Sequence, residues 1–182
     1  MKNKLIVLQE GNKDCGAASL LSVIRYYGGD ISIDRLLEMT KTTKEGTNFY
    51  NMSEAVSKFR LIAKCFKVDD IEKIKNIDVP FIVQLNNKNY MHFVVVYRVN
   101  NNKVTMMDPA KGKCIVDIFD FANMWTGYIM LFEKMGNVPT YRGNKVLNNI
   151  ILTTLIKNKS TILFLIILSI IFTSLSCLSY LY

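Results

Sequence analysis

The sequence predicts an α+β domain over residues 1–135, with helices first and an antiparallel sheet after them, followed by a basic and apolar tail. Three observations support this prediction. Apolar residues recur every three or four positions up to residue 59, five short β-like runs lie between residues 81 and 132, and residues 160–182 carry no charge. A chain of 182 residues is long enough for one such domain and a modest appendage.

The first half of the domain is predicted to be helical. Asp14 is a good helix N-cap, and apolar residues follow it at helical spacing until Gly28 and Gly29 end the helix. A second helix is expected over 33–39. A third is expected after Gly46, on apolar residues that are three or four positions apart: Phe49, Met52, Val56 and Phe59.

The second half of the domain is predicted to form strands. The apolar runs cover 81–85, 90–99, 103–108, 113–118 and 127–132, and Asn-rich or Pro-containing turns separate the earlier ones. Helices followed by an antiparallel sheet indicate an α+β domain.

The tail is predicted to have three parts. Residues 136–143 contain Gly, Pro and polar residues and are expected to be a linker. Residues 144–159 place apolar residues at helical spacing, which predicts an amphipathic interfacial helix. Residues 160–182 are dominated by Ile, Leu and Phe, which predicts a transmembrane helix. A buried core helix, the alternative, would normally be shorter.

The charge distribution favours a membrane surface as a partner. The formal net charge is +8, and all 15 acidic residues lie at or before Glu133, so the tail is basic and free of acid. Basic residues of the domain are scattered, which argues against nucleic acid as a partner. One histidine, and four cysteines without C-x-x-C spacing, argue against a metal site.

The domain is expected on the cytoplasmic side of a cell membrane. Its N-terminal apolar run is only four residues long, too short for a signal-peptide core. Positive residues prefer the cytoplasmic side of a membrane span, and four precede residue 160 in the tail: Arg142, Lys145, Lys157 and Lys159. The thiols would then be reduced.

Cys15 is the candidate nucleophile. A catalytic thiol needs a stabilised thiolate, a base within reach and donors for an oxyanion. Cys15 follows Asp14 at a predicted helix start, where free N–H groups and the helix dipole favour a negative sulfur. The small residues Gly16 and Ala17 would let a substrate backbone approach. From position alone, a buried cysteine in a helical turn remains the alternative.

His92 is the only histidine, so a histidine base must be this residue. A three-residue turn at 100–102 would make Asp108 its diagonal neighbour on the same face of a hairpin. A two-residue turn would put the two on opposite faces, and Asp108 would only begin an Asp-Pro turn. Gln9 could donate its amide to an oxyanion, although an isolated Gln at a strand end is usually only solvated.

Five segments of the chain, in this order and over about residues 5–134, resemble the double-glycine leader peptidase domain of peptidase-containing ABC transporters, which process bacteriocins: QEGNKDCGAASLLSVIRYYG, EGTNFYNMSEA, MHFVVVYRV, VTMMDPAKGK and MWTGYIMLF. The resemblance implies a papain-like fold. Its Q-x(5)-D-C-G motif implies that Gln9 is an oxyanion donor and Cys15 the nucleophile. Its histidine before a hydrophobic strand and its D-P-A-x-G motif imply that His92 is the general base and acid and that Asp108 orients it.

The resemblance also implies a bacterial cysteine endopeptidase that removes a leader after Gly-Gly or Gly-Ala, coupled to export by a homodimeric ABC transporter. The leader would dock on an apolar groove, for which Tyr90, Met91 and Trp125 are candidates, although each could instead be core. No G-x-x-x-x-G-K-[ST] loop is present, so no cofactor is expected in this chain, and ATP only on a nucleotide-binding domain outside it.

Three functions from other classes stay open. A leader-binding module would keep the groove without cleaving. A structural membrane component would do neither. A thiol redox protein would need a second cysteine near Cys15, and none lies within local reach in the sequence.

Overall fold

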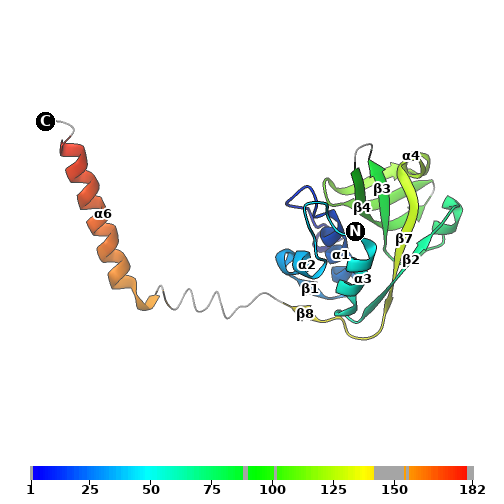
Figure 1. Cartoon of the computed structure of the whole chain (residues 1–182), viewed down its shortest axis with the longest axis horizontal. Coiled ribbons are helices and arrows are strands. Elements are labelled where there is room, and N and C mark those ends of the chain that lie inside the picture. The colour runs from blue at the N-terminus through cyan, green and yellow to red at the C-terminus, as the bar shows by residue number, and fades with distance from the viewer. Residues whose placement is uncertain (1, 88–89, 101, 142–153, 155, 180–182) are drawn as a thin grey trace. The chain divides into compact units, whose positions relative to one another are not determined.

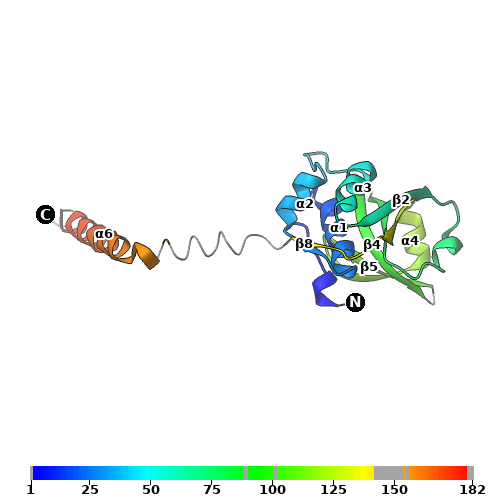
Figure 2. The same cartoon turned by 90° about the horizontal axis from the view of Figure 1, so that it is seen from below.

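The computed structural model describes residues 2–87, 90–100, 102–141, 154 and 156–179, and the chain divides into two compact units, 1–142 and 143–182 (Figures 1 and 2). Helices of the first unit are η1 (Asn3–Leu5), α1 (Cys15–Tyr26), α2 (Ile33–Met39), α3 (Phe49–Ser57), η2 (Ile71–Ile74) and α4 (Ile118–Met124). Its strands are β1 (Asp30–Ile31), β2 (Leu61–Lys67), β3 (Phe81–Asn87), β4 (Tyr90–Asn100), β5 (Lys103–Asp108), β6 (Gly112–Asp117), β7 (Trp125–Lys134) and β8 (Thr140–Tyr141).

Six of these strands form an antiparallel sheet in the order β2-β7-β3-β4-β5-β6, and β1 pairs with β8 in parallel. Helices α1 and α3 pack on one face of the sheet, and α4 packs on the other (Figure 1). The predicted α+β class is therefore confirmed.

The sheet is buried on both faces at its centre. Val95 belongs to the core cluster under α1, whereas Val94 and Val96 belong to the cluster with Phe121 of α4. Because neighbouring residues of a strand point to opposite faces, a strand covered on both sides needs a continuous apolar run. This requirement explains the sequence FVVV in β4.

The predicted helices at 33–39 and after Gly46 are confirmed as α2 and α3, and the five predicted strands correspond to β3 to β7. Strand β2 and helix α4 are among the elements that were not predicted. Strand β2 buries only its first residue, Leu61, so its sequence lacks a clear apolar alternation. Helix α4 directly follows β6, and the Asp117 carboxylate caps it by accepting the N–H of Phe119 at 2.8 Å.

The tail differs from its prediction. The stretch 136–143, expected to be a linker, contains β8, and Val138 packs against the core, so the compact unit extends beyond residue 135. Most of the interfacial helix expected over 144–159 lies outside the described residues. Helix α6 covers Lys159–Ser179. Within the part of the chain that is described, no helix has the length and apolarity of a membrane span, so the transmembrane helix expected over 160–182 is not confirmed.

Candidate active site

Cys15 is the first residue of α1 and is buried. Asp14 holds the N-cap position, but its carboxylate does not bond to the helix. It accepts the N–H of Gly11 at 2.7 Å instead and so closes the loop before Cys15, while the predicted N-cap position of Asp14 is confirmed. The N–H groups of the first helical turn are therefore left for a negative sulfur or an oxyanion.

His92 and Asp108 form a buried pair on neighbouring strands. The Nε2 atom of His92, on β4, lies 2.7 Å from Oδ1 of Asp108, the last residue of β5. The same Oδ1 accepts the N–H of Ala110 at 2.8 Å. A carboxylate held by two hydrogen bonds is fixed in position and can in turn fix the imidazole ring.

The hairpin reaches this geometry by a route that differs from the prediction. Asn100 pairs with Lys103, so the turn has two residues and not three. A bulge between Val96 and Arg98 then shifts the register, and Val95 pairs with Met107. The extra residue in β4 compensates for the shorter turn, so the predicted pairing of the two functional side chains is correct although the predicted turn is wrong.

Cys15 and His92 each shift the pKa of the other so that the charged form of both is favoured. Burial raises the pKa of the Cys15 thiol, but hydrogen bonds from His92 and from the Phe93 backbone outweigh it, so the pKa lies below its ordinary value. Burial likewise lowers the pKa of His92, but hydrogen bonds to Asp108 and Cys15 raise it to about 9. Since Nε2 faces Asp108, Nδ1 is the ring nitrogen left for the sulfur. This arrangement favours a thiolate and an imidazolium.

Asp108 is suited to remain ionised beside this pair. Burial raises the pKa of its carboxyl group, but the hydrogen bonds from His92 and the Ala110 backbone, and the charge of His92, lower the pKa below its ordinary value. A charged Asp108 stabilises the imidazolium form of His92 and fixes its ring.

Ser19 is a supporting residue that the sequence reasoning missed. It is fully buried one turn after Cys15, and its Oγ donates to the carbonyl of Phe93 at 3.1 Å. The backbone of Phe93 in turn bonds to the Cys15 sulfur. Ser19 thus ties α1 to β4 at the point where thiol and imidazole meet. Its i, i+4 spacing from Cys15 places both on one helix face, a signal available in the sequence.

We expect Ser19→Ala to lower kcat of peptide cleavage by roughly fivefold, because losing a buried hydrogen bond of about 1 kcal/mol loosens the Cys15–His92 contact. The pH dependence of Cys15 alkylation should shift toward higher pH. Ser57→Ala is a matched control, since Ser57 is exposed and bonds only to the carbonyl of Glu54. An unchanged alkylation profile in Ser19→Ala would contradict the positioning role.

The small residues after Cys15 serve packing. Gly16 and Ala17 are both buried, and a Cβ added to Gly16 would lie 2.4 Å from Cγ2 of Thr47 and 3.3 Å from Cδ2 of Phe93. Their expected role, to let a substrate backbone approach, is therefore not what the structure supports. The close approach of α1 to Thr47, just before α3, and to β4 requires the glycine.

Two of the three groove candidates, Tyr90 and Met91, lie at the surface, and Tyr90 contacts His92. Tyr90 is 46% exposed and packs edge-on against the His92 ring, with 6.0 Å between ring centroids, and Met91 is 54% exposed. Trp125 is partly buried and stacks on Phe121 in the second core cluster. The core alternative is therefore wrong for Tyr90 and Met91.

The backbone of Gln9 lies next to the pair of His92 and Asp108. Its N–H donates to the carbonyl of Pro109 at 2.9 Å, directly after Asp108. Its side-chain Oε1 is buried without a hydrogen-bond partner among the described atoms, and the residue lines a cavity of about 400 Å³ that Tyr90 also lines. A buried amide oxygen without a donor is costly unless a ligand completes it. In the described part of the chain, no three His, Cys, Asp or Glu side chains gather to hold a metal ion.

Residues 3–137 match the family described as Peptidase C39. The chain belongs to the Peptidase C39 family. Its globular unit is a cysteine peptidase domain of this family, which agrees with the thiol, imidazole and carboxylate that the fold brings together.

Two of the curated relatives are much longer than this chain. The lactococcin-G-processing and transport ATP-binding protein LagD of Lactococcus lactis subsp. lactis is 36% identical over 133 residues, which are 72% of this chain and 19% of the relative. The pediocin PA-1 transport/processing ATP-binding protein PedD of Pediococcus acidilactici is 31% identical over 68% of this chain and 18% of its own length. The matched region thus spans about a fifth of these relatives.

Solved C39 structures have the same fold. A double glycine motif protease from an AMS/PCAT transporter, in complex with the leader peptide, has a TM-score of 0.66 and 28% identity over 71% of this chain and 90% of its own. The peptidase domain of Streptococcus ComA, a bi-functional ABC transporter involved in a quorum sensing pathway, has a TM-score of 0.65 and 32% identity over 70% of this chain and 96% of its own.

Proposed function

We propose that this domain removes the leader of bacteriocin-like precursor peptides by hydrolysis after Gly-Gly or Gly-Ala, with Cys15 as nucleophile. The observation that carries the proposal is the buried pair of His92 and Asp108, 2.7 Å apart, beside the buried Cys15, whose pKa His92 lowers. A thiolate next to an imidazolium is a nucleophile next to an acid, which acyl transfer from a peptide requires.

In this mechanism the Cys15 sulfur attacks the carbonyl carbon of the last leader glycine. The oxyanion that forms is stabilised by the Gln9 amide and by N–H groups at the start of α1. His92 gives its proton to the departing amine, and the C–N bond breaks to leave a thioester. His92 then takes a proton from water, which attacks the thioester and releases the leader, while Asp108 holds the ring throughout.

Cleavage can be tested on a precursor whose leader ends in Gly-Gly. The full chain should release the leader at that bond, and replacing the last glycine by valine should abolish release. A chain that binds the precursor without cleaving it would instead be a leader-binding module, the second candidate. The buried Cys15–His92 contact favours the enzyme, because binding alone does not need it.

The relatives' names support a place in peptide export, since they are processing and transport ATP-binding proteins. We infer that the domain works as part of a homodimeric ABC transporter, and that ATP is used on a nucleotide-binding domain outside this sequence. Tyr90, which packs against the His92 ring, and the exposed Met91 are candidates for leader contact.

The proposed location is the cytoplasmic side of a cell membrane, with the tail attached to the membrane. The four basic residues of the tail before residue 160 support this orientation. A protease site inserted between Asn100 and Lys103 should be cut only after the membrane is opened. Cutting by protease added to intact cells would place the domain outside.

Replacing Gln9 by alanine should lower kcat with little change in KM, because losing one oxyanion donor costs about 2.7 to 4 kcal/mol in the transition state, or roughly 10²- to 10³-fold. Asn12→Ala is a matched control, since Asn12 lines the same cavity. Steady-state kinetics on a leader peptide measure both variants. A change confined to KM would assign Gln9 to substrate binding.

The activity should depend on pH as a bell. It rises as the Cys15 thiolate forms, and because the pKa of Cys15 is lowered, this limb lies below 9.0, the ordinary value of a cysteine. It falls as the imidazolium of His92 loses its proton, at a pH of about 9. Profiles of kcat/KM on a leader peptide measure both limbs. Activity that keeps rising well above pH 9 would contradict the role of a protonated His92.

A further inference from the structure

A second cavity, of about 650 Å³, lies at the far end of α1 from Cys15. It adjoins Tyr26, the last residue of α1, strand β5 and the edge strand β6. Four of its lining residues are exposed cations: Lys2, Lys4, Arg98 and Lys113. Among the described residues, no acidic side chain lines this cationic cavity, and no ion pair neutralises any of the four.

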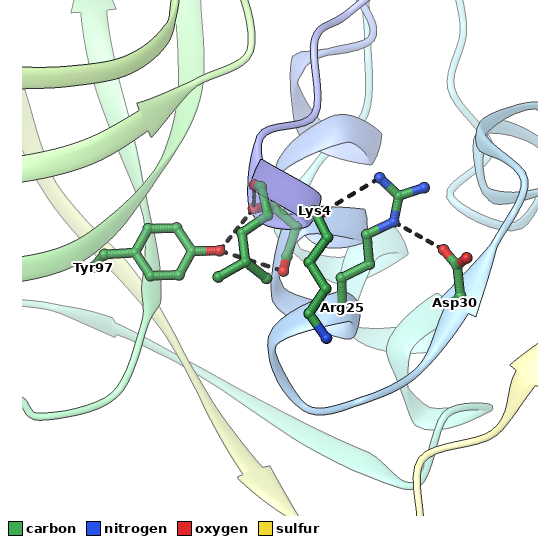
Figure 3. A network of polar contacts seen from close by, with 6 residues as sticks. Lys4, Arg25, Asp30 and Tyr97 are labelled. Atoms are coloured by element: carbon green, nitrogen blue, oxygen red, sulfur yellow. Dashed lines mark hydrogen bonds and ion pairs between the residues drawn. The ribbon is translucent and has the colours of Figure 1, made fainter. Parts of the chain in front are cut away.

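The fold holds this arrangement in place. Tyr97 and Arg98 are consecutive on β4 and would normally point to opposite faces, but the bulge at this position lets both line the cavity. The Tyr97 hydroxyl is fixed by Ser22 of α1, at 2.7 Å. Figure 3 shows that Lys4 joins the network through its backbone carbonyl, which accepts from Arg25, while its ammonium points away from the network.

Cations that converge without acidic partners repel one another, so such a cavity favours an anionic ligand. Arg25 differs, because its guanidinium is paired with Asp30 at 2.8 Å (Figure 3). The rim is partly apolar, with Tyr26 43% and Ile115 58% exposed. Tyrosines and aliphatic side chains among lysines are typical of surfaces that meet phospholipid headgroups.

The course of the chain after the cavity indicates which kind of anionic ligand it binds. Lys4 also lines a smaller cavity with Thr140 of β8, the last strand of the globular unit. After β8 the sequence contains basic residues and no acidic one up to Tyr182, and it includes the apolar helix α6. The cationic cavity thus lies next to the point where the chain continues into a segment of the composition that anionic membranes attract.

We infer that the cationic cavity binds the headgroups of anionic phospholipids and holds the peptidase domain against a membrane surface. A soluble acidic peptide could pair with the same cations, but it would not explain why the cationic cavity lies beside β8. The site is separate from Cys15 and does not depend on the proposed reaction.

The test compares the full chain with two charge-matched triple variants. One replaces Lys4, Arg98 and Lys113 of the cavity by glutamine, and the other replaces Lys44, Lys67 and Lys73, which are exposed and do not line it. The partition coefficient is measured on phosphatidylglycerol-containing vesicles and on phosphatidylcholine vesicles. Helix α6 contributes to binding on both kinds of vesicle, so the ratio of the two partition coefficients isolates the charge-dependent part of membrane binding.

Each cation close to an anionic surface adds about fivefold to binding, so the cavity variant should lower the ratio by roughly 100-fold. The control variant should change it by about twofold or less, because charges farther than about 8 Å from the surface are screened at physiological salt. Thermal unfolding checks that both variants fold. An equal fall in both variants, or no fall in the cavity variant, would overturn the inference. Binding of oligoglutamate that is lost in the cavity variant while the vesicle ratio stays unchanged would also overturn it, in favour of a protein partner.

Discussion

Replacing Cys15 by alanine is expected to abolish cleavage of a Gly-Gly precursor, with a loss in kcat on the order of 10⁶-fold. In the proposed mechanism the Cys15 sulfur forms the thioester, and neither Cys65 nor Cys114 is suited to replace it. Cys65 is exposed on β2 and Cys114 lies on β6, and burial raises the pKa of both thiols. Leader release, followed by mass spectrometry, measures the effect.

Two further measurements make this prediction specific. Cys65→Ala is the matched control and should keep full activity. Iodoacetamide at neutral pH should label Cys15 before Cys65 and Cys114, because its lowered pKa provides more thiolate. Cleavage retained in Cys15→Ala would rule out the covalent mechanism, and earlier labelling of Cys65 would contradict the activated thiolate.

The elements that were predicted correctly carry local signals. Helix α2 begins and ends at the predicted residues, and the strands from β3 to β7 follow apolar runs between recognisable turns. Strand β2 lacks such a signal, because six of its seven residues are not buried and its pairing with β7 comes from tertiary structure. The pairing of β8 with β1 joins residues 30 and 140, a contact that no local pattern reveals.

In the candidate site, too, some features were predicted from the sequence and others depend on tertiary structure. His92 and Asp108 were expected on one face of a hairpin, and the structure brings them together, but through a two-residue turn and a bulge at Tyr97. The residues around Tyr97 include no Gly, so the sequence gives no signal of a bulge at this position. The Asp14 carboxylate accepts the N–H of Gly11 and not one of the helix. This choice depends on loop geometry, so it could not be predicted from the sequence either.

Replacing His92 by alanine should lower kcat by at least the roughly 10²- to 10⁴-fold that is typical of general acid and base catalysis. The loss should exceed this range if the thiolate also disappears, because the hydrogen bond from His92 lowers the pKa of Cys15. Iodoacetamide labelling of Cys15 should therefore shift to higher pH in the same variant.

Asp108 should act only through His92, and a double-mutant cycle can test this. Asp108→Ala removes the acceptor 2.7 Å from Nε2, so the imidazolium loses its stabilising charge and its fixed orientation. Once His92 is absent, however, adding Asp108→Ala should cost little further in kcat, because groups that act as one unit are not additive. Asp117→Ala is the matched control, since it removes a carboxylate that caps α4 and is exposed. Two full and independent losses in the double variant would mean that Asp108 supports the fold or the substrate separately from His92, and the proposed pairing in catalysis would be wrong.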